Sequence, residues 1–400
     1  QRYYCPDIKM KKLKILGIIT EDNAVGFYRI WQPLKMLEKL GLAELKLTPT
    51  FHWAKTKEAQ PFPNLDWFSD KDGFFNTQYT GQKRIGNDQH IIVAERHDNV
   101  PYVALLGTLK NYKVPIVVDT DDDVTAVRPF NPGYATYQPN SDAIAANMKL
   151  MSMADAITTS TNQLKEVHEK FNKPTFVVPN SIDLVTRSFP AKKTKKIRIG
   201  WLGSACHWEN LQIIQQAVKD IIANYPEVEF IFTNLYGDIW ASPPKELADR
   251  IIPTCNFNGC DKKHSGCNKS YVDFKKYAKF TNGMAIDIGL APLQDNLFNR
   301  SKSNLRLLEY WANGSAVIAS PVRPYKETVI DGKNGLLAKE KLDWYKAIER
   351  LILDEKLREK LKVEGRKTLE KDFSMENNAL KLYKIYNKII NEFKPDRSSK

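Results

Sequence analysis

Three side chains in the second half of the chain are spaced to bind a phosphorylated sugar or a nucleotide. Lys302 and Ser303 stand where a helix is expected to begin, and Glu309 follows within that helix. Free backbone N–H groups and the positive end of the helix dipole favour a phosphate at such a position, and a lysine ammonium adds to that attraction. A glutamate carboxylate accepts hydrogen bonds from two neighbouring sugar hydroxyls. The spacing therefore predicts a phosphate site at the helix start and a sugar site further along.

The elements around these side chains predict a nucleotide-binding architecture. An apolar run over Ile286–Ala291 is cut off by Pro292, which is typical of a buried strand. A helix is predicted over Ser303–Trp311, and Asn313 and Gly314 end it. A second short strand is predicted over 317–319. The order strand, loop, helix, strand is half of a doubly wound fold, in which ligands bind where strand ends meet helix starts.

This segment resembles the nucleotide-sugar site of GT-B glycosyltransferases, specifically the family called glycosyl transferases group 1. The resemblance implies that Glu309 binds the ribose of the donor and that Lys302, Ser303 and Asn304 hold its diphosphate. Members of the family often carry a second glutamate eight positions before the ribose glutamate, close to the donor sugar. Here that position is Ser301, so the usual contact to the sugar is missing and the donor sugar is left open.

Strands are predicted over 13–20, 114–118 and 156–160, and helices over 30–40 and 163–170, the latter with Thr161 as its N-cap. Strands and helices alternate in this way along both halves, which predicts parallel sheets covered by helices. The segment that contains Asn180 and Asp183 resembles the end of the first GT-B domain. We therefore expect an α/β fold with two Rossmann-like, doubly wound domains that face each other across a cleft. The expected parts are an acceptor domain over residues 1–185, a nucleotide-sugar domain over 186–378, and a C-terminal helix and tail over 379–400. The resemblance implies that this last helix returns to the first domain.

Two further strand ends carry groups suited to the donor. Gly203 allows a close backbone approach to a diphosphate, and Ser204 can donate a hydrogen bond to it. The family often places an arginine and a lysine here, whereas this chain has His207, which is either a replacement donor or a surface residue. In the first half, Gly26 and Arg29 follow the first strand. Arg29 either pairs with the phosphate or the acceptor, or lies on an exposed helix face.

An acidic run over 119–123 follows another predicted strand. Asp121 and Asp122 could hold a divalent metal on the diphosphate, could bind the acceptor or act as a general base, or could belong to a solvated turn. The GT-B resemblance argues against the metal, because that fold normally needs none. His97, which also follows a strand, either orients an acceptor hydroxyl or has no catalytic task.

Four potential soft metal ligands lie close together in the second half: Cys255, Cys260, His264 and Cys267. Thiolates and imidazoles at short spacing can close a structural zinc site, although this spacing is not that of a common zinc finger. The alternative is a surface insertion with reduced thiols. A structural zinc ion is therefore a hypothesis, and no cofactor is expected to be required for catalysis.

The composition bears on partners and location. The chain has 60 Lys and Arg residues against 47 Asp and Glu, a net charge of +13. This indicates either a lysine-rich surface or a polyanionic partner such as nucleic acid, anionic lipid or acidic glycan. There is no apolar run of about 18 residues, and the first nine residues lack the apolar core of a signal peptide. A cytoplasmic location is the resulting expectation.

Together these features predict a glycosyltransferase that moves a sugar from a nucleotide-sugar donor, with retention at the anomeric carbon and without a metal. The acceptor is left open between DNA, as in phage enzymes that glucosylate bases, and a glycan or lipid of the cell envelope. The alternative is a degenerate GT-B protein that binds nucleotide sugar or polyanion without turnover, which Ser301 favours. An epimerase on the same fold is disfavoured, because its acidic and histidine pairs have no counterpart that we can place.

Overall fold

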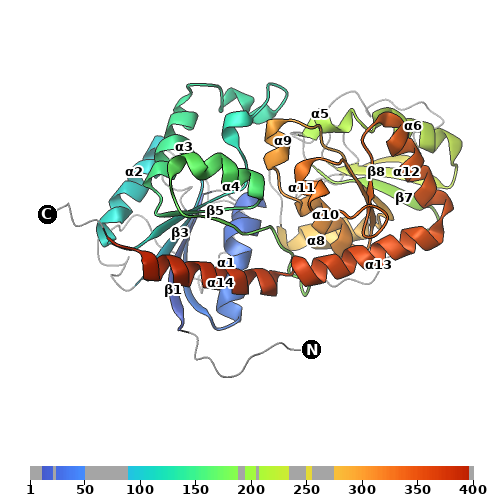
Figure 1. Cartoon of the computed structure of the whole chain (residues 1–400). Helices are drawn as coiled ribbons and strands as arrows, with labels where there is room; N and C mark the ends of the chain where they lie inside the picture. The colour runs from blue at the N-terminus through green and yellow to red at the C-terminus, as the bar shows by residue number, and fades with distance from the viewer. Residues whose placement is uncertain are drawn as a thin grey trace, which may run out of the picture.

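The chain folds into two α/β domains, each built on a six-stranded parallel sheet (Figure 1). The structure is a computed structural model, and it describes residues 11–20, 24–49, 89–187, 194–203, 207–233, 249–254 and 274–395. This confirms the predicted pair of doubly wound domains. Each sheet is covered by helices on both faces, so its central strands are buried on both sides and are largely apolar.

The first sheet has the strand order β2-β1-β3-β4-β5-β6. Its strands are β1 (Leu13–Ile19), β2 (Ala43–Pro49), β3 (Ile91–Glu95), β4 (Ile116–Thr120), β5 (Ala156–Thr159) and β6 (Thr175–Val177). Strand β4 ends two residues later than the sequence predicts, so that Asp119 lies inside the buried strand. That burial is tolerated because the carboxylate of Asp119 is paired with Arg29.

The helices of the first domain are α1 (Gln32–Lys39), α2 (Val100–Leu109), α3 (Asp142–Met153) and α4 (Asn162–His168). Thr161 caps α4 as predicted, since its side chain accepts a hydrogen bond from the N–H of Leu164. The first helix differs from the prediction, which began it at Ile30. A π-helical segment over Gly26–Trp31 precedes α1 directly, so Gly26 and Arg29 lie on a helix and not in a loop. Such segments are rare and are frequent at functional sites.

The second sheet has the strand order β12-β11-β10-β7-β8-β9. Its strands are β7 (Ile197–Trp201), β8 (Val228–Thr233), β9 (Ile251–Thr254), β10 (Ile288–Ala291), β11 (Ala316–Ala319) and β12 (Leu336–Leu337). The helices of this domain are α5 (Trp208–Leu211), α6 (Gln215–Asn224), α8 (Phe274–Gly283), α9 (Leu297–Ser301), α10 (Leu305–Ala312), α11 (Arg323–Lys326), α12 (Lys341–Leu353) and α13 (Glu355–Asp372).

The last helix, α14 (Met375–Glu392), returns to the first domain and packs beside α1 (Figure 1). Met375, Tyr383 and Tyr386 lie on one face of α14 and are buried in the core of the first domain. This apolar face gives the helix its place, because its exposure to water would be unfavourable. The return of the C-terminal helix, which the sequence resemblance implied, is thus confirmed.

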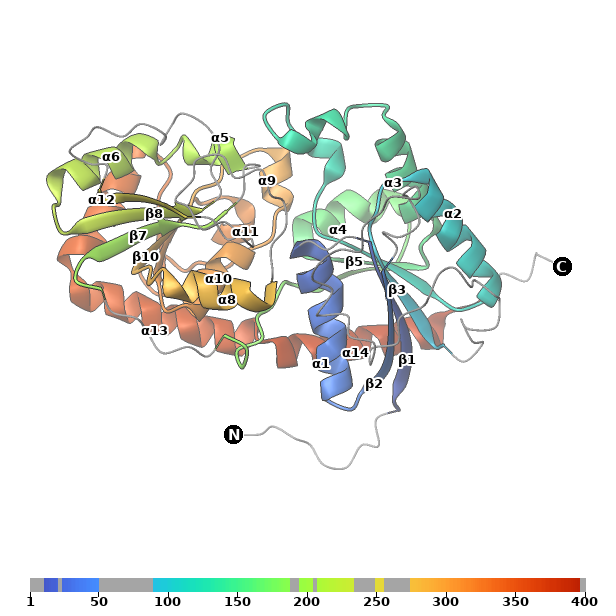
Figure 2. The ribbon, with the colours of Figure 1, turned by 180° about the vertical axis from the view of Figure 1, so that it is seen from behind.

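The carboxyl ends of the two sheets face each other, and three side-chain bonds connect the loops and helix starts at these ends. The hydroxyl of Thr161 donates to the carbonyl of Ser301 over 3.1 Å. Asn180 donates to Ser303, and Lys302 donates to Asp122. Seen from behind, α1 and α8 also lie on opposite sides of the boundary between the domains (Figure 2). Side chains of both domains that the sequence indicates as candidate site residues are therefore brought to one place.

Candidate donor-binding site

The start of α10 lies where the side chains of the two domains meet. Asn304 is its N-cap residue, but the side chain of Asn304 does not cap the helix. Its Nδ2 donates instead to the hydroxyl of Thr328 over 3.1 Å. The first N–H of α10, that of Leu305, donates to the hydroxyl of Ser303 over 3.4 Å, so Ser303 and not Asn304 contacts the positive end of the helix.

Lys302 forms an ion pair across the cleft. Its Nζ donates to Asp122 Oδ1 at 2.9 Å and lies 4.4 Å from the centre of the Phe298 ring. Both charged side chains are partly exposed. The ammonium is thus held by an oxyanion of the other domain, in the position at which the sequence predicts a phosphate oxyanion.

Ser303 is the end of a hydrogen-bond chain that starts inside the first domain. Asn180 Nδ2 donates to the hydroxyl of Ser303 over 2.8 Å. The amide oxygen of Asn180 accepts from Arg29 Nη1 over 3.0 Å. Arg29 in turn donates two hydrogen bonds of 2.8 Å, from Nε and Nη2, to the two oxygens of Asp119. The first domain therefore fixes the orientation of the amide that contacts Ser303.

Arg29 itself is buried and held within the first domain. Besides Asp119 and Asn180, it donates to the carbonyl of Val178 over 2.6 Å. The hydroxyl of Thr158 adds a bond of 2.6 Å to Asp119. A bidentate, buried pair of this kind is rigid, and removal of one partner leaves an uncompensated charge. Arg29, which the sequence nominates as a catalytic group, contacts other residues of its own domain in this structure.

Asp121 carries an oxygen that is buried and has no hydrogen-bond partner among the described residues. Burial, with the neighbouring charge of Asp122, raises the pKa of Asp121 to about 6, against the opposing effects of Arg29, Arg96 and Lys302. A buried polar atom without a partner is uncommon in folded proteins and is frequent where a ligand or catalytic proton belongs. A carboxyl with a pKa of about 6 changes its protonation state close to neutral pH.

The carboxylate of Glu309 is buried and contacts three side chains. The hydroxyl of Tyr28 donates to Oε1 over 2.8 Å, and that of Tyr277 donates to Oε2 over 3.4 Å. Arg187 Nη2 lies 2.7 Å from the oxygen of Tyr28 and 3.3 Å from Oε1. Burial raises the pKa of Tyr28 well above its ordinary value, so this hydroxyl keeps its proton and stays a donor. Glu309 thus acts as a hydrogen-bond acceptor, the role a sugar hydroxyl pair requires.

The three residues that contact Glu309 were not predicted from the sequence. Tyr28 is adjacent to Arg29, but its spacing to Glu309 is visible only in three dimensions. Arg187 lies in the segment between the domains, and Tyr277 lies on α8 after an insertion. Arg187 and Tyr277 do not follow a predicted strand end, whereas Tyr28 lies between Gly26 and Arg29, which do.

Gly203, at the end of β7, is held by Thr233 of the neighbouring strand. The N–H of Gly203 donates to the hydroxyl of Thr233 over 2.8 Å, and this hydroxyl donates to the carbonyl of Gly203 over 3.0 Å. A Cβ atom at position 203 would fall 2.3 Å from the ring of Trp201. A glycine is therefore required here by the packing. Ser204, predicted beside it, lies outside the described residues.

His207 is arranged as a neutral hydrogen-bond donor. Burial, with the charges of Arg306 and Lys302, lowers the pKa of His207 well below its ordinary value. Its Nδ1 lies 3.2 Å from Nδ2 of Asn210. That amide cannot be reversed, because its oxygen accepts from the backbone N–H of Gln294 over 2.8 Å. Since Asn210 donates to Nδ1, the ring hydrogen is on Nε2 and is available to a ligand.

Arg306 supplies a charge that the sequence did not nominate. Its guanidinium lies 5.3 Å from the centre of the Trp201 ring, at the end of β7. The family often carries basic residues at this strand end, and the chain has none there. Arg306 comes to the same region from the first turn of α10 and places a positive charge beside the end of β7.

The remaining candidate residues from the sequence either lie near this site or fall outside the described residues. Gly26 is buried in the π-helical segment, and His97 is half-buried after β3 with its ring 5.7 Å from that of Tyr102. Within the described ranges, no cluster of three or more His, Cys, Asp or Glu side chains is placed to hold a metal. The potential zinc ligands lie outside these ranges: Cys255, Cys260, His264 and Cys267.

Comparison with known proteins agrees with this geometry. Residues 305–368 match the model of the family described as glycosyl transferases group 1. This match begins at the first residue of α10 and includes Glu309. A search among curated proteins finds no relative by sequence.

Solved structures share the fold along nearly the whole chain. Sucrose-phosphate synthase from Thermosynechococcus elongatus superimposes with a TM-score of 0.61 at 15% identity, over 95% of this chain and 100% of that one. Anabaena HepE in complex with UDP and glucose gives 0.59 at 12% identity, over 94% and 100%. A Listeria monocytogenes protein described as a UDP-N-acetylglucosamine 2-epimerase gives 0.53 at 13% identity, over 96% and 99%.

These likenesses show the fold, which transferases and an epimerase share. The family match is what separates the two classes, because it falls on the helix that carries Glu309. Among the described helices, none is both long and apolar enough to cross a membrane. The sheet topology and these superpositions show that the chain has the GT-B fold, and the sequence of residues 305–368 is similar to glycosyl transferases group 1.

Proposed function

We propose that the protein transfers a sugar from a nucleoside diphosphate sugar to a hydroxyl or amine of an acceptor. The observation that carries this proposal is the order of groups on α10. Lys302 and Ser303 precede the helix, and Glu309 lies on its second turn. The helix rises about 9 Å over six residues, which is comparable to the span from a diphosphate to its ribose.

The diphosphate is proposed to leave with the help of the second domain. As the bond between the anomeric carbon and the diphosphate oxygen breaks, negative charge develops on the leaving group. In the proposal, groups of the second domain stabilise this charge: Lys302, the positive end of α10, the Nε2–H of His207 and the guanidinium of Arg306. Groups that are fixed in place before the reaction stabilise a transition state without further reorganisation.

The first domain is proposed to handle the acceptor. Asp121 takes the acceptor proton, and its unpartnered oxygen and pKa of about 6 support this role. Asp122 releases Lys302 to the diphosphate, because the two negative charges of the diphosphate attract the ammonium more strongly than one carboxylate does. Arg29 acts through Asn180 by positioning Ser303. His97 stays a proposed contact for an acceptor hydroxyl.

Donor entry requires the domains to separate locally. The ribose hydroxyls must replace Tyr28 and Arg187 at the carboxylate of Glu309, and both of these come from outside the second domain. Closure over the bound donor then excludes water and limits hydrolysis. We propose UDP as the nucleotide, because HepE, which has the same fold, was solved with UDP-glucose.

The proposed reaction retains the anomeric configuration and uses no metal, as the family resemblance implies. The acceptor is proposed to be anionic, either DNA or a glycan of the cell envelope, because the net charge is +13. A cytoplasmic location is part of the proposal.

The test is release of nucleoside diphosphate by the purified protein from a panel of UDP-, GDP-, ADP- and TDP-sugars, with and without EDTA. We expect release from one donor that EDTA does not change. Glu309→Ala should reduce release by about 100-fold, because two hydrogen bonds to a carboxylate are worth about 3 kcal/mol together. Tyr28→Phe is the matched control, since it removes a partner of Glu309 and leaves the carboxylate. Absence of both release and nucleotide binding would exclude the proposed function.

A second candidate is a protein that binds nucleotide sugar or polyanion without turnover. Two observations favour it: Ser301 stands where the family has a sugar-binding glutamate, and Glu309 is occupied by protein side chains. This candidate predicts nucleotide binding in calorimetry together with no release from any donor, even over long incubation.

A further inference from the structure

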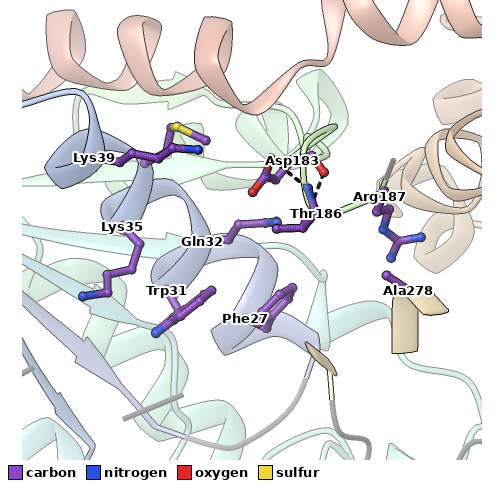
Figure 3. A pocket seen from close by; sticks show the side chains of 10 residues that line it. Phe27, Trp31, Gln32, Lys35, Lys39, Asp183, Thr186, Arg187 and Ala278 are labelled. Atoms are coloured by element: carbon purple, nitrogen blue, oxygen red, sulfur yellow. Dashed lines mark hydrogen bonds between the residues drawn. The ribbon is translucent and has the colours of Figure 1, made fainter. Parts of the chain in front are cut away.

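A second pocket lies between α1 and the segment that connects the domains. It encloses about 220 Å³. Figure 3 shows residues of α1 and its π-helical start along one side, and Asp183, Thr186 and Arg187 of the connecting segment along the other. Ala278 of α8 closes the end near Arg187. Apart from Arg187, none of these residues was assigned to donor binding above.

One face of the first helix forms a regular stripe along this pocket. Phe27, Trp31, Lys35 and Lys39 follow one another at intervals of four residues, which places them on one side of a helix. The rings of Phe27 and Trp31 are stacked, with centres 5.3 Å apart and an angle of 17° between planes. The stripe therefore changes from flat aromatic surface to positive charge along the pocket.

Two residues that line this pocket each have a buried polar atom without a hydrogen-bond partner among the described residues. The two atoms are Nη1 of Arg187 and Oε1 of Gln32, and both residues are more than nine-tenths buried, with 6% and about 9% of their surface exposed. The other terminal nitrogen of Arg187 contacts Tyr28 and Glu309, so Nη1 is the free end of an anchored guanidinium. Buried donors and acceptors in folded proteins are nearly always paired, which indicates that a ligand supplies the missing partners.

The charges along the pocket define where an anion would lie. Three basic side chains line it, Lys35, Lys39 and Arg187, against the single acidic Asp183. Lys35 also pairs with Glu38 at 2.9 Å. One oxygen of Asp183 accepts from the backbone N–H of Val185 over 3.0 Å. An anionic group is therefore favoured at the Arg187 end and hydroxyl groups are favoured near Gln32 and Asp183.

We propose that this pocket binds a sugar ring that carries a carboxylate. The carboxylate accepts from Arg187 Nη1, a ring hydroxyl donates to Gln32 Oε1, and the apolar face of the ring lies on Phe27 and Trp31. A neutral sugar leaves Arg187 without its acceptor. A small inorganic anion leaves Gln32 without a donor and the aromatic rings uncovered. The inference rests on the pocket alone and does not depend on the transfer reaction.

The test is calorimetry on the full chain with glucuronic acid, glucose and inorganic phosphate, each at low salt. Glucuronic acid is expected to bind at least tenfold more tightly than either of the others. Gln32→Leu should weaken glucuronic acid by about 2- to 12-fold, the effect of one hydrogen bond. Lys39→Met should weaken it by about 2- to 5-fold, as expected for an exposed charge. Lys346→Met, an exposed lysine on α12, is the matched control and should change nothing.

The outcomes separate this inference from the proposed function. Equal binding of glucose or phosphate, or an unchanged affinity in Gln32→Leu, would overturn the acidic-sugar pocket. UDP titrated into each variant tests whether the donor site is intact. A protein that binds UDP but not glucuronic acid contradicts this inference alone. A protein that binds glucuronic acid but neither binds nor turns over any nucleotide sugar contradicts the proposed function alone.

Discussion

Both domains direct the carboxyl ends of their strands toward the cleft. The charged side chains at these ends find their hydrogen-bond partners in different places. In the first domain, the buried Asp119 is bound by Arg29 and Thr158, all of them from that domain. In the second domain, Lys302 and Glu309 are bound by Asp122 and Tyr28, which come from across the cleft. The buried charge of Asp119 is thus paired within its own domain, whereas Lys302 and one oxygen of Glu309 are paired across the domain boundary.

This difference indicates which groups can change partners. A bond between domains can be exchanged for a ligand when the cleft opens, and neither domain has to unfold. A buried ion pair inside one domain can be broken only with a large loss of stability. The second-domain groups are therefore suited to donor binding, and the Arg29 pair is suited to holding Asn180 in position. Substitutions on the two edges should separate these roles.

The largest effect is expected for Arg29→Met. It leaves the carboxylate of Asp119 buried without its cation, and we expect the free energy of unfolding to fall by about 3–5 kcal/mol. Urea denaturation measures this loss. Lys35→Met on the adjoining α1 is the control, because its partly exposed ion pair with Glu38 should contribute less than about 1 kcal/mol. A stable Arg29→Met protein that has lost only activity would reverse our assignment and make Arg29 a ligand-binding group.

A smaller effect on stability and a selective effect on activity are expected for Lys302→Met. Its partner Asp122 is partly exposed, so the free energy of unfolding should change by less than about 1 kcal/mol. The kcat/KM for donor consumption should fall by about 10- to 100-fold, since one charge-assisted contact to the leaving phosphate is lost. Steady-state release of nucleoside diphosphate measures it, and Lys302→Arg should recover part of the activity. An equal loss of stability in Lys302→Met and Arg29→Met would remove the contrast between the two edges.

The smallest effect is expected from pH, through Asp121. Because its pKa is raised to about 6, a base at this position is active only when ionised, and kcat/KM should rise with pH through about 6. One pH unit below that value the activity should be about tenfold lower than the plateau. Asp121→Asn should remove this limb of the pH profile along with most of the activity. A profile of the same shape in the variant would assign the titration to another group.

The raised pKa of Asp121 also affects stability. Activity is expected to rise with pH, whereas the contribution of Asp121 to the stability of the folded protein is expected to fall. A carboxyl whose pKa is raised on folding is stabilised in its protonated form, so its contribution is present below the ordinary aspartate pKa and is lost as pH rises through about 6. Relative to Asp121→Asn, the wild-type protein should therefore become less stable between pH 4 and pH 7. Urea denaturation across this range gives the difference directly.

Most of the fold was predictable from local patterns. The apolar strand runs and the predicted N-cap Thr161 correspond closely to β1, β5 and α4. The deviations occur where tertiary contacts override the local signal. Asp119 is drawn into β4 by its pair with Arg29, and helical structure is already present at Gly26, before the predicted helix start. A carboxylate inside a buried strand and a π-helical segment have no reliable signal in one sequence.

Only the part of the candidate site that lies on and before α10 was predictable from the sequence. Lys302, Ser303 and Glu309 lie on one short helix and its approach, so their spacing in the sequence sets their spacing in space. Tyr28 and Arg187 come from segments far from Glu309 along the chain. No periodic pattern connects such residues, because their proximity depends on how the two domains are placed.

By itself, the sequence determined the class of the fold and the order of groups along α10, since both follow from the periodicity of apolar residues and from helix geometry. The tertiary structure decided which polar groups are available to a ligand. It paired Arg29 inside the first domain, left one oxygen of Asp121 buried without a partner among the described residues, and placed Arg187 between Glu309 and a second pocket. Availability depends on burial and on the partners that distant segments supply, and these exist only once the chain has folded.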